Sequence, residues 1–92
     1  MREELMTALK EAMKAKDTRR VSTIRMVQSA IKDLDIARRT KADPTVSDGD
    51  IASLLSKLVK QREESAKIYD EGGRPELAAQ EREEIAIISE FM

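Results

Sequence analysis

An apolar residue recurs every three or four positions through the middle of the first half of this chain. The stripe consists of Val21, Ile24, Val27, Ile31 and Leu34. Because an α-helix completes a turn in 3.6 residues, this spacing places all five side chains on one helical face. Asp17 precedes the stripe, where its carboxylate can accept hydrogen bonds from the free N–H groups of a first helical turn. The pattern therefore predicts a long amphipathic helix that begins after Asp17.

Three further helices are predicted around this one. An apolar face repeats at helical spacing over residues 2–15, which predicts a first helix. The pair Asp43-Pro44 disfavours helix, since proline lacks the N–H group and restricts the residue before it. Ser47 and Asp50 then predict an imperfect capping box for a third helix, with Asp in place of the usual Glu or Gln.

The end of the third helix and the start of the fourth are also marked. Gly72-Gly73 supplies a residue that tolerates positive φ, and Pro75 suits a first helical turn. With 38% charged residues and only Tyr69 and Phe91 as aromatics, the core must be aliphatic. We therefore predict an all-α fold, a compact bundle of four helices with short connections, formed by residues 1–92 as a single domain.

Cysteine content and hydropathy bear on the compartment. The chain has no cysteine, which fits a reducing compartment. No apolar run approaches the roughly 20 residues that span a bilayer, and the first residues lack the apolar core of a signal peptide. The expectation is a cytoplasmic protein without membrane contact.

The charges are unevenly distributed along the chain. Residues 14–41 hold nine basic and three acidic side chains, whereas residues 63–92 hold three basic and nine acidic ones. One interpretation is an anionic partner for the basic part. The other is that the two parts neutralise each other across a helix interface.

Six basic side chains beside the apolar stripe form a candidate RNA-binding site. They are Arg19, Arg20, Arg25, Lys32, Arg38 and Arg39. Arginine suits a phosphate backbone because its planar donors pair with phosphate oxygens. Aromatic residues for stacking bases are almost absent, so any RNA contact should read backbone and shape, and no DNA partner is expected. The competing interpretation is an ordinary solvated helix face.

Two charged residues interrupt otherwise apolar stripes. Arg62 lies on the apolar face of the third helix, and Glu81 lies on that of the fourth. A half-buried charge is costly unless it is paired. Arg62 is therefore expected to pair with a carboxylate of a neighbouring helix, or else to lie open in a groove and contact phosphate.

Patterns of catalytic residues are mostly missing. The chain has neither histidine nor cysteine, which excludes the usual zinc sites and thiol or Ser–His nucleophiles. Glu81 and Glu84 are spaced as in carboxylate-bridged metal bundles, but those sites need a histidine as well. We assign no catalytic residue, no metal and no cofactor.

Four segments of the chain resemble the N-terminal helical domain of the GatB/YqeY family. They are AKDTRR (15–20), TIRMVQSAIK (23–32), QREESAKIYDEGGRPELAAQEREEI (61–85) and ISEF (88–91). The most specific part extends from Arg62 to Glu81. The residues that match the family pattern are Asp17, Arg19, Arg25, Lys32, Arg62, Tyr69, Gly73, Arg74, Glu81 and Glu84.

The resemblance implies a function connected with tRNA. Family members resemble the helical and tail regions of the B subunit of tRNA-dependent amidotransferases, which are carbon–nitrogen ligases that use glutamine as amide donor to convert misacylated Glu- or Asp-tRNA. Those regions help to engage the tRNA. The resemblance therefore implies an accessory role in tRNA-dependent amidation, through tRNA or partner recognition, without an active site of its own.

The chain departs from the family pattern at its end. Family members continue beyond the Phe91 region into a smaller helical tail domain, whereas this chain stops at Met92, so we expect either a fragment or a one-domain member. The missing tail leads to an alternative function as a protein-interaction or self-assembly domain unrelated to RNA. In that case an apolar strip of Ile85, Ile88 and Phe91 would be exposed and would dock onto a partner or a second copy.

Overall fold

Four helices and no strand make up the chain. In the computed structural model, which describes residues 1–92, the helices are α1 (Arg2–Lys14), α2 (Thr18–Arg38), α3 (Asp48–Glu71) and α4 (Pro75–Ser89). The prediction of an all-α fold with four helices is confirmed. None of these helices has the combination of length and apolar content that crossing a bilayer requires.

The residues expected at the helix starts make the expected contacts. The Asp17 carboxylate accepts a hydrogen bond from the backbone N–H of Arg20 at 3.1 Å, and α2 begins at the next residue after Asp17. Ser47 Oγ accepts the N–H of Asp50 at 3.1 Å, and the Asp50 carboxylate accepts the N–H of Ser47 at 3.0 Å. The capping box of α3 is therefore complete with aspartate. Pro75 is the first residue of α4.

Both helical hairpins turn through a residue with positive φ. After α3 this residue is Gly73, with φ of 72°, and the next N–H donates to the Tyr69 carbonyl at 2.8 Å. After α1 it is Lys16, with φ of 56°, and the next N–H donates to the Ala12 carbonyl at 3.0 Å. These hydrogen bonds satisfy carbonyl groups that the helix ends leave free. In the turn after α1, the residue with positive φ is a lysine, although this conformation favours glycine.

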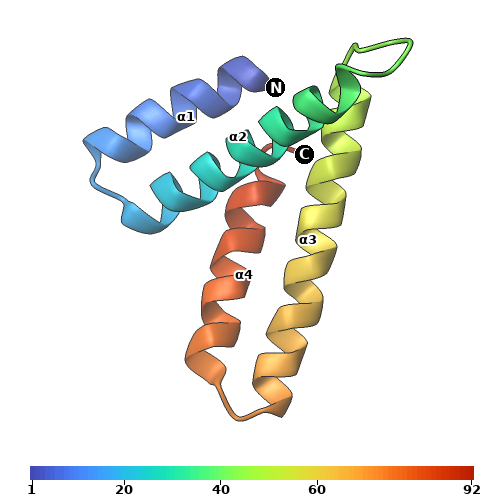
Figure 1. Cartoon of the computed structure of the whole chain (residues 1–92). Coiled ribbons are helices and arrows are strands. Elements are labelled where there is room, and N and C mark those ends of the chain that lie inside the picture. The colour runs from blue at the N-terminus through green and yellow to red at the C-terminus, as the bar shows by residue number, and fades with distance from the viewer.

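The helices form two antiparallel hairpins that meet at one end (Figure 1). Helix α1 runs back along α2, and α4 runs back along α3. The backbone of α2 also approaches α3 and α4, whereas that of α1 lies close to α2 alone. Since the lower halves of α3 and α4 extend beyond the junction, the molecule measures 47 × 32 × 18 Å. One side of α1 is thus left without a helical neighbour.

The core lies where the two hairpins meet. All four helices and the C-terminal residues contribute to it through Leu5, Ala8, Ala12, Ile24, Val27, Ile31, Ile51, Leu55, Ile88 and Phe91. Fully burying an aliphatic side chain of the size of leucine contributes about 1.5–3 kcal/mol. Outside this cluster, the buried apolar side chains of α3 and α4 are two alanines, Ala66 and Ala78. The larger apolar contacts are therefore concentrated at the junction and hold α2 in place.

The expected exposed apolar strip at the end of α4 is not present. Ile88 is 0% exposed and Phe91 is 9% exposed, and Ile85 is half-buried. Ile88 and Phe91 belong to the core because the two hairpins close over the C-terminal end of α4. This strip therefore offers no free surface to a partner or a second copy.

Candidate nucleic-acid interface

Two of the six candidate RNA-binding residues pair with carboxylates of α4. Arg20 Nη1 lies 2.5 Å from Glu90 Oε2, and this hydrogen bond raises the pKa of Arg20. Arg19 Nε lies 3.3 Å from Glu83 Oε2, and Arg19 Nη1 lies 3.9 Å from Glu84 Oε1. The basic first half and the acidic last part of the chain therefore meet at the interface between α2 and α4. These two guanidinium groups are neutralised inside the protein.

Arg62 forms the expected pair between helices, and its partner is Glu84. The Nε of Arg62 lies 2.9 Å from Glu84 Oε2, and its Nη1 donates to the Leu58 carbonyl at 3.2 Å. Both side chains are mostly buried, with 17% and 24% of their surfaces exposed. Since Glu84 also lies near Arg19, this one carboxylate connects α2, α3 and α4. Arg62 is therefore not an open phosphate contact.

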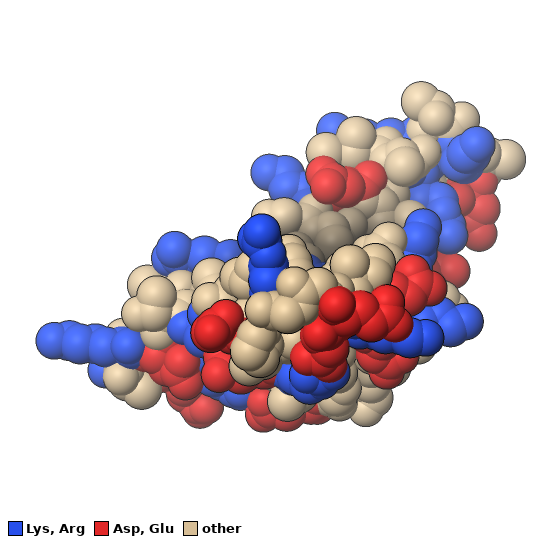
Figure 2. All heavy atoms as spheres, turned by 90° about the horizontal axis from the view of Figure 1, so that it is seen from below, with Lys and Arg blue, Asp and Glu red and all other residues tan.

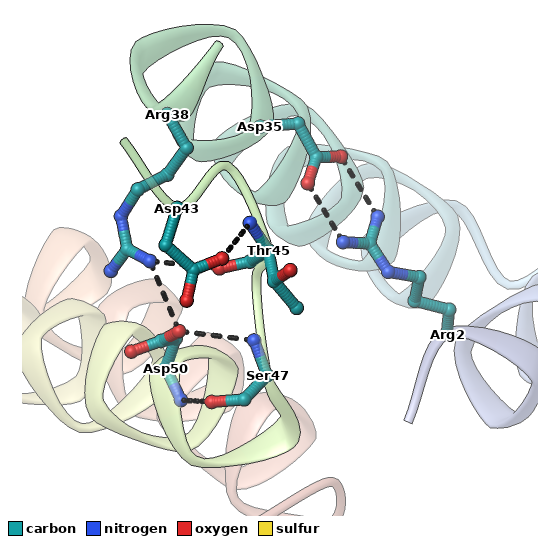
Figure 3. A network of polar contacts seen from close by, with 7 residues as sticks. All are labelled: Arg2, Asp35, Arg38, Asp43, Thr45, Ser47 and Asp50. Atoms are coloured by element: carbon teal, nitrogen blue, oxygen red, sulfur yellow. Dashed lines mark hydrogen bonds and ion pairs between the residues drawn. The ribbon is translucent and has the colours of Figure 1, made fainter. Parts of the chain in front are cut away.

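Arg38 is engaged at the connection between α2 and α3 (Figure 3). Its Nη1 donates to the Thr45 carbonyl at 3.0 Å and to Asp50 Oδ2 at 3.2 Å. The pKa of Asp50 lies below its usual value, mainly because of the hydrogen bond from the backbone N–H of Ser47 and next because of the hydrogen bond from Arg38. The N–H of Thr45 donates to Asp43 Oδ1 at 3.0 Å and lowers the pKa of Asp43. These contacts tie the loop to the ends of both helices.

Sequence reasoning missed two ion pairs that join neighbouring helices. Arg2 on α1 makes two hydrogen bonds, of 2.9 and 2.8 Å, to the Asp35 carboxylate on α2 (Figure 3). These bonds are the main cause of the lowered pKa of Asp35. Arg82 on α4 donates a single hydrogen bond, from Nη2, to Asp70 Oδ2 on α3, which lowers the pKa of that aspartate. The antiparallel register of each hairpin is the only signal that would predict these pairs.

Three of the six candidates remain without an acidic partner. Arg25, Lys32 and Arg39 are exposed, and no carboxylate lies within ion-pair distance of them. They are seven residues apart, close to two helical turns, so they follow one side of α2 at intervals of about 10 Å. Arg39 is the C-cap of α2 and keeps helical backbone angles. We call Arg25, Lys32 and Arg39 the cation row.

The remaining residues of the family pattern mostly serve the fold. Asp17 caps α2, the carbonyl of Tyr69 accepts a hydrogen bond in the turn after α3, and Gly73 provides the positive φ there. Arg74 is the exposed N-cap of α4, without a side-chain capping bond. Glu81 is half-buried on α4. These residues are not brought together with the cation row.

One face of the molecule carries charges of both signs (Figure 2). Figure 2 shows basic and acidic side chains interspersed over the face seen from below. The cation row forms no ion pair, and Asp35 acts on Arg39 only at longer range: the pKa of Asp35 is lowered mainly by the hydrogen bonds from Arg2 and to a smaller extent by the charge of Arg39. The chemistry available at the row is electrostatic, namely the binding of an anionic group.

Comparison with known proteins assigns the chain to a family. A profile of the family described as Yqey-like protein matches residues 2–92. A protein of Vanderwaltozyma polyspora named "Altered inheritance of mitochondria protein 41, mitochondrial" is 38% identical over 85 residues. Proteins of the same name are 37% identical in Saccharomyces cerevisiae and 30% identical in Candida glabrata, each over 84 residues. In all three cases the match covers 91% of this chain.

These matches cover less than half of each relative, 44% or 45% of its length. The chain therefore spans about half the length of the curated relatives that it matches.

The comparisons contradict the expectation of a cytoplasmic protein. The printed name of the relatives contains the word mitochondrial, which points to mitochondria rather than the cytoplasm. The expectation was wrong because the lack of cysteine indicates only a reducing environment. It does not indicate which reducing compartment contains the protein. The YqeY part of the resemblance is confirmed by the match over residues 2–92. This chain belongs to the YqeY-like protein family.

Proposed function

We propose that this domain has an accessory role in tRNA-dependent amidation and holds the tRNA backbone with the cation row. The reaction is that of a carbon–nitrogen ligase with glutamine as amide donor. The domain recognises the tRNA and has no active site of its own. The resemblance of the family to regions of amidotransferase B subunits supports this choice of reaction.

The observation that carries the proposal is the unpaired state of the cation row. Phosphate oxygens compete poorly for a guanidinium group that already has a carboxylate partner, because that partner must first be displaced. Arg19, Arg20 and Arg38 have such partners, and the cation row has none. The proposed contact surface is therefore narrower than the full set of six basic residues.

The arrangement of the interior supports a recognition role over a catalytic one. The charged side chains at the helix interfaces, such as Arg62 and Glu84, bond to each other and join helices. The exposed α2 face presents cations at regular intervals, with the small side chain of Ser29 between Arg25 and Lys32. Such a face can approach a backbone closely.

We place this function in residues 1–92 as one binding domain. The chain spans about half the length of its relatives. Any activity or partner of those whole proteins is therefore carried over to this chain only as a proposal. Their printed name supports a search for the relevant tRNA in mitochondria.

Titration of labelled tRNA with this chain at increasing salt tests the proposal. If three phosphates are neutralised, log K falls with log salt at a slope of about −2 to −3, so affinity drops roughly 20- to 40-fold between about 50 and 200 mM salt. The substitutions R25Q/K32Q/R39Q should lower the magnitude of that slope by about two to three, close to zero, since they remove all three phosphate contacts.

A matched control removes three exposed lysines from α3 instead, as K57Q/K60Q/K67Q. It changes the net charge equally and should leave the slope close to that of the unaltered chain. Absence of tRNA binding at about 50 mM salt, or an equal loss in the two triple variants, contradicts the proposal.

A further inference from the structure

Exposed apolar side chains gather on the α1–α2 hairpin. Five large apolar side chains of the chain are exposed, and three of them lie on these two helices. Met6 and Met13 on α1 are 55% and 50% exposed, and Ile36 on α2 is 46% exposed. Met6 and Met13 are seven residues apart, so they lie on the same side of α1. An exposed group of this kind is more informative than a single exposed apolar residue.

A hollow of about 220 Å³ opens between α1 and α2 next to these methionines. It is lined by Arg2, Leu5, Met6, Gln28 and Ile31. Leu5 and Ile31 are almost fully buried and form an apolar floor. Gln28 brings an amide, which both donates and accepts hydrogen bonds. The hollow is smaller than the roughly 300–1,000 Å³ of pockets for drug-sized ligands, and it suits one flat ring system.

The cation row lies beside this hollow, because Gln28 of the lining is three residues after Arg25 and four before Lys32 on the same side of α2. Arg25 Nη2 lies 4.0 Å from Met13 Sδ, so the first member of the row touches the methionine side of α1. Met6 lines the hollow together with Gln28 and Ile31 of α2, and the exposed Lys32 follows Ile31 in the chain. At the far end Asp35 is hydrogen-bonded to Arg2, and its charge acts on Arg39 only at longer range. Apolar groups of α1 and cationic groups of α2 thus lie next to each other on the hairpin.

We infer that the α1–α2 hairpin binds single-stranded RNA, with an unstacked base in the hollow and phosphates on the cation row. This inference rests on the proposed function and specifies its ligand as a loop or end of the tRNA. In a duplex the bases are stacked and their faces are hidden, so the apolar groups would have no partner there. Methionine sulfur makes favourable contacts with aromatic rings, and an arginine plane stacks on bases.

The spacing favours a nucleic acid over an acidic amphipathic helix. A helix that docks in a groove presents apolar anchors at every turn, and it needs a continuous apolar stripe to receive them. Met6 and Met13 are instead separated by about 10 Å along α1, and exposed Lys10 lies between them. Each nucleotide of a single-stranded RNA carries a flat base and a negative phosphate, which match apolar and cationic side chains that lie next to each other.

Three labelled oligonucleotides of equal length test the inference. They are single-stranded oligoadenylate, the same backbone without bases, and duplex RNA. Oligoadenylate should bind about two- to tenfold more tightly than the abasic backbone, as expected for one or a few sulfur–ring contacts. The substitutions M6Q/M13Q should abolish this preference and leave the salt slope unchanged, because they remove apolar surface and no charge.

The control is I68Q, which alters the exposed apolar residue of α3, far from the hairpin, and should keep the preference for bases. Equal binding of oligoadenylate and abasic backbone, or tighter binding of the duplex, overturns the inference. Binding of an acidic amphipathic peptide that M6Q/M13Q weakens, without any preference for bases, overturns it in favour of a protein partner. In each case a retained salt-dependent affinity for tRNA leaves the proposed function standing, whereas loss of all tRNA binding removes both.

Discussion

Glu84 joins three helices, and Arg62 is its closest partner. The pair combines a 2.9 Å contact with side chains that are 17% and 24% exposed. Sequence spacing predicted a paired Arg62, because a cation on an apolar stripe needs compensation. It did not identify Glu84 as the partner. The charge that interrupts the apolar stripe of the fourth helix is Glu81, and Glu84 lies three residues further on. The choice depends on how α3 and α4 are rotated about their axes, which spacing along one helix does not specify.

Arg62→Ala should lower the free energy of unfolding by about 1–3 kcal/mol. This estimate lies between the cost of breaking an exposed pair and that of breaking a fully buried one, because water still reaches both groups. Chemical denaturation measures the change. The control is Arg74→Ala, since Arg74 is exposed and forms no ion pair, and that change should stay within about 0.5 kcal/mol. An unaltered denaturation midpoint for Arg62→Ala would show that the pair contributes nothing.

At the scale of the helices, the two hairpin turns have the same geometry with different residues. Gly73 adopts positive φ without strain, whereas Lys16 adopts it with a side chain. The second turn was predicted from its glycines. The first was not, because no residue type near Lys16 indicates positive φ. Local patterns therefore located the helix ends at both turns, and missed only the positive φ of Lys16, which the fold imposes.

Opposite effects on stability are expected from two exchanges at these turns. Gly73→Ala should destabilise the protein by about 1–2 kcal/mol, because a Cβ is unfavourable at positive φ. The cost is conformational, since no neighbouring atom lies within 4 Å of an added Cβ at Gly73. Lys16→Gly should stabilise it by about 0.5–1 kcal/mol through release of the same strain, partly offset by a more flexible unfolded chain. Thermal unfolding of the two variants side by side measures both effects, and a destabilised Lys16→Gly would contradict this account.

At the scale of the whole molecule, the six basic candidates along α2 fall into a paired group and an unpaired group. Arg19 and Arg20 meet acidic residues of α4, and Arg38 meets Asp50 at the start of α3. Arg25, Lys32 and Arg39 are left exposed without carboxylate partners. Mutual neutralisation thus holds for three of the six residues, and an anionic partner is our proposal for the other three. The sequence identified all six as candidates but could not separate the paired residues from the unpaired ones. That separation depends on which face of α2 the second hairpin covers.

The same limit applies to the apolar residues. The alternative function as an interaction domain required Ile88 and Phe91 to be exposed, and they are buried by the crossing of the hairpins. Met6 and Met13 instead lie open beside the cation row. Helical periodicity separates an apolar face from a polar one, but it does not determine which part of an apolar face receives a neighbour.

The central claim is that paired arginines hold the fold and unpaired cations hold the ligand. Two variants of equal charge, R25Q/K32Q and R20Q/R38Q, test it most directly through the salt dependence of tRNA affinity. The account predicts that the magnitude of the slope falls by about two for R25Q/K32Q. For R20Q/R38Q it should stay near that of the unaltered chain, provided that circular dichroism shows the helices to be intact. An equal fall in both variants would contradict it.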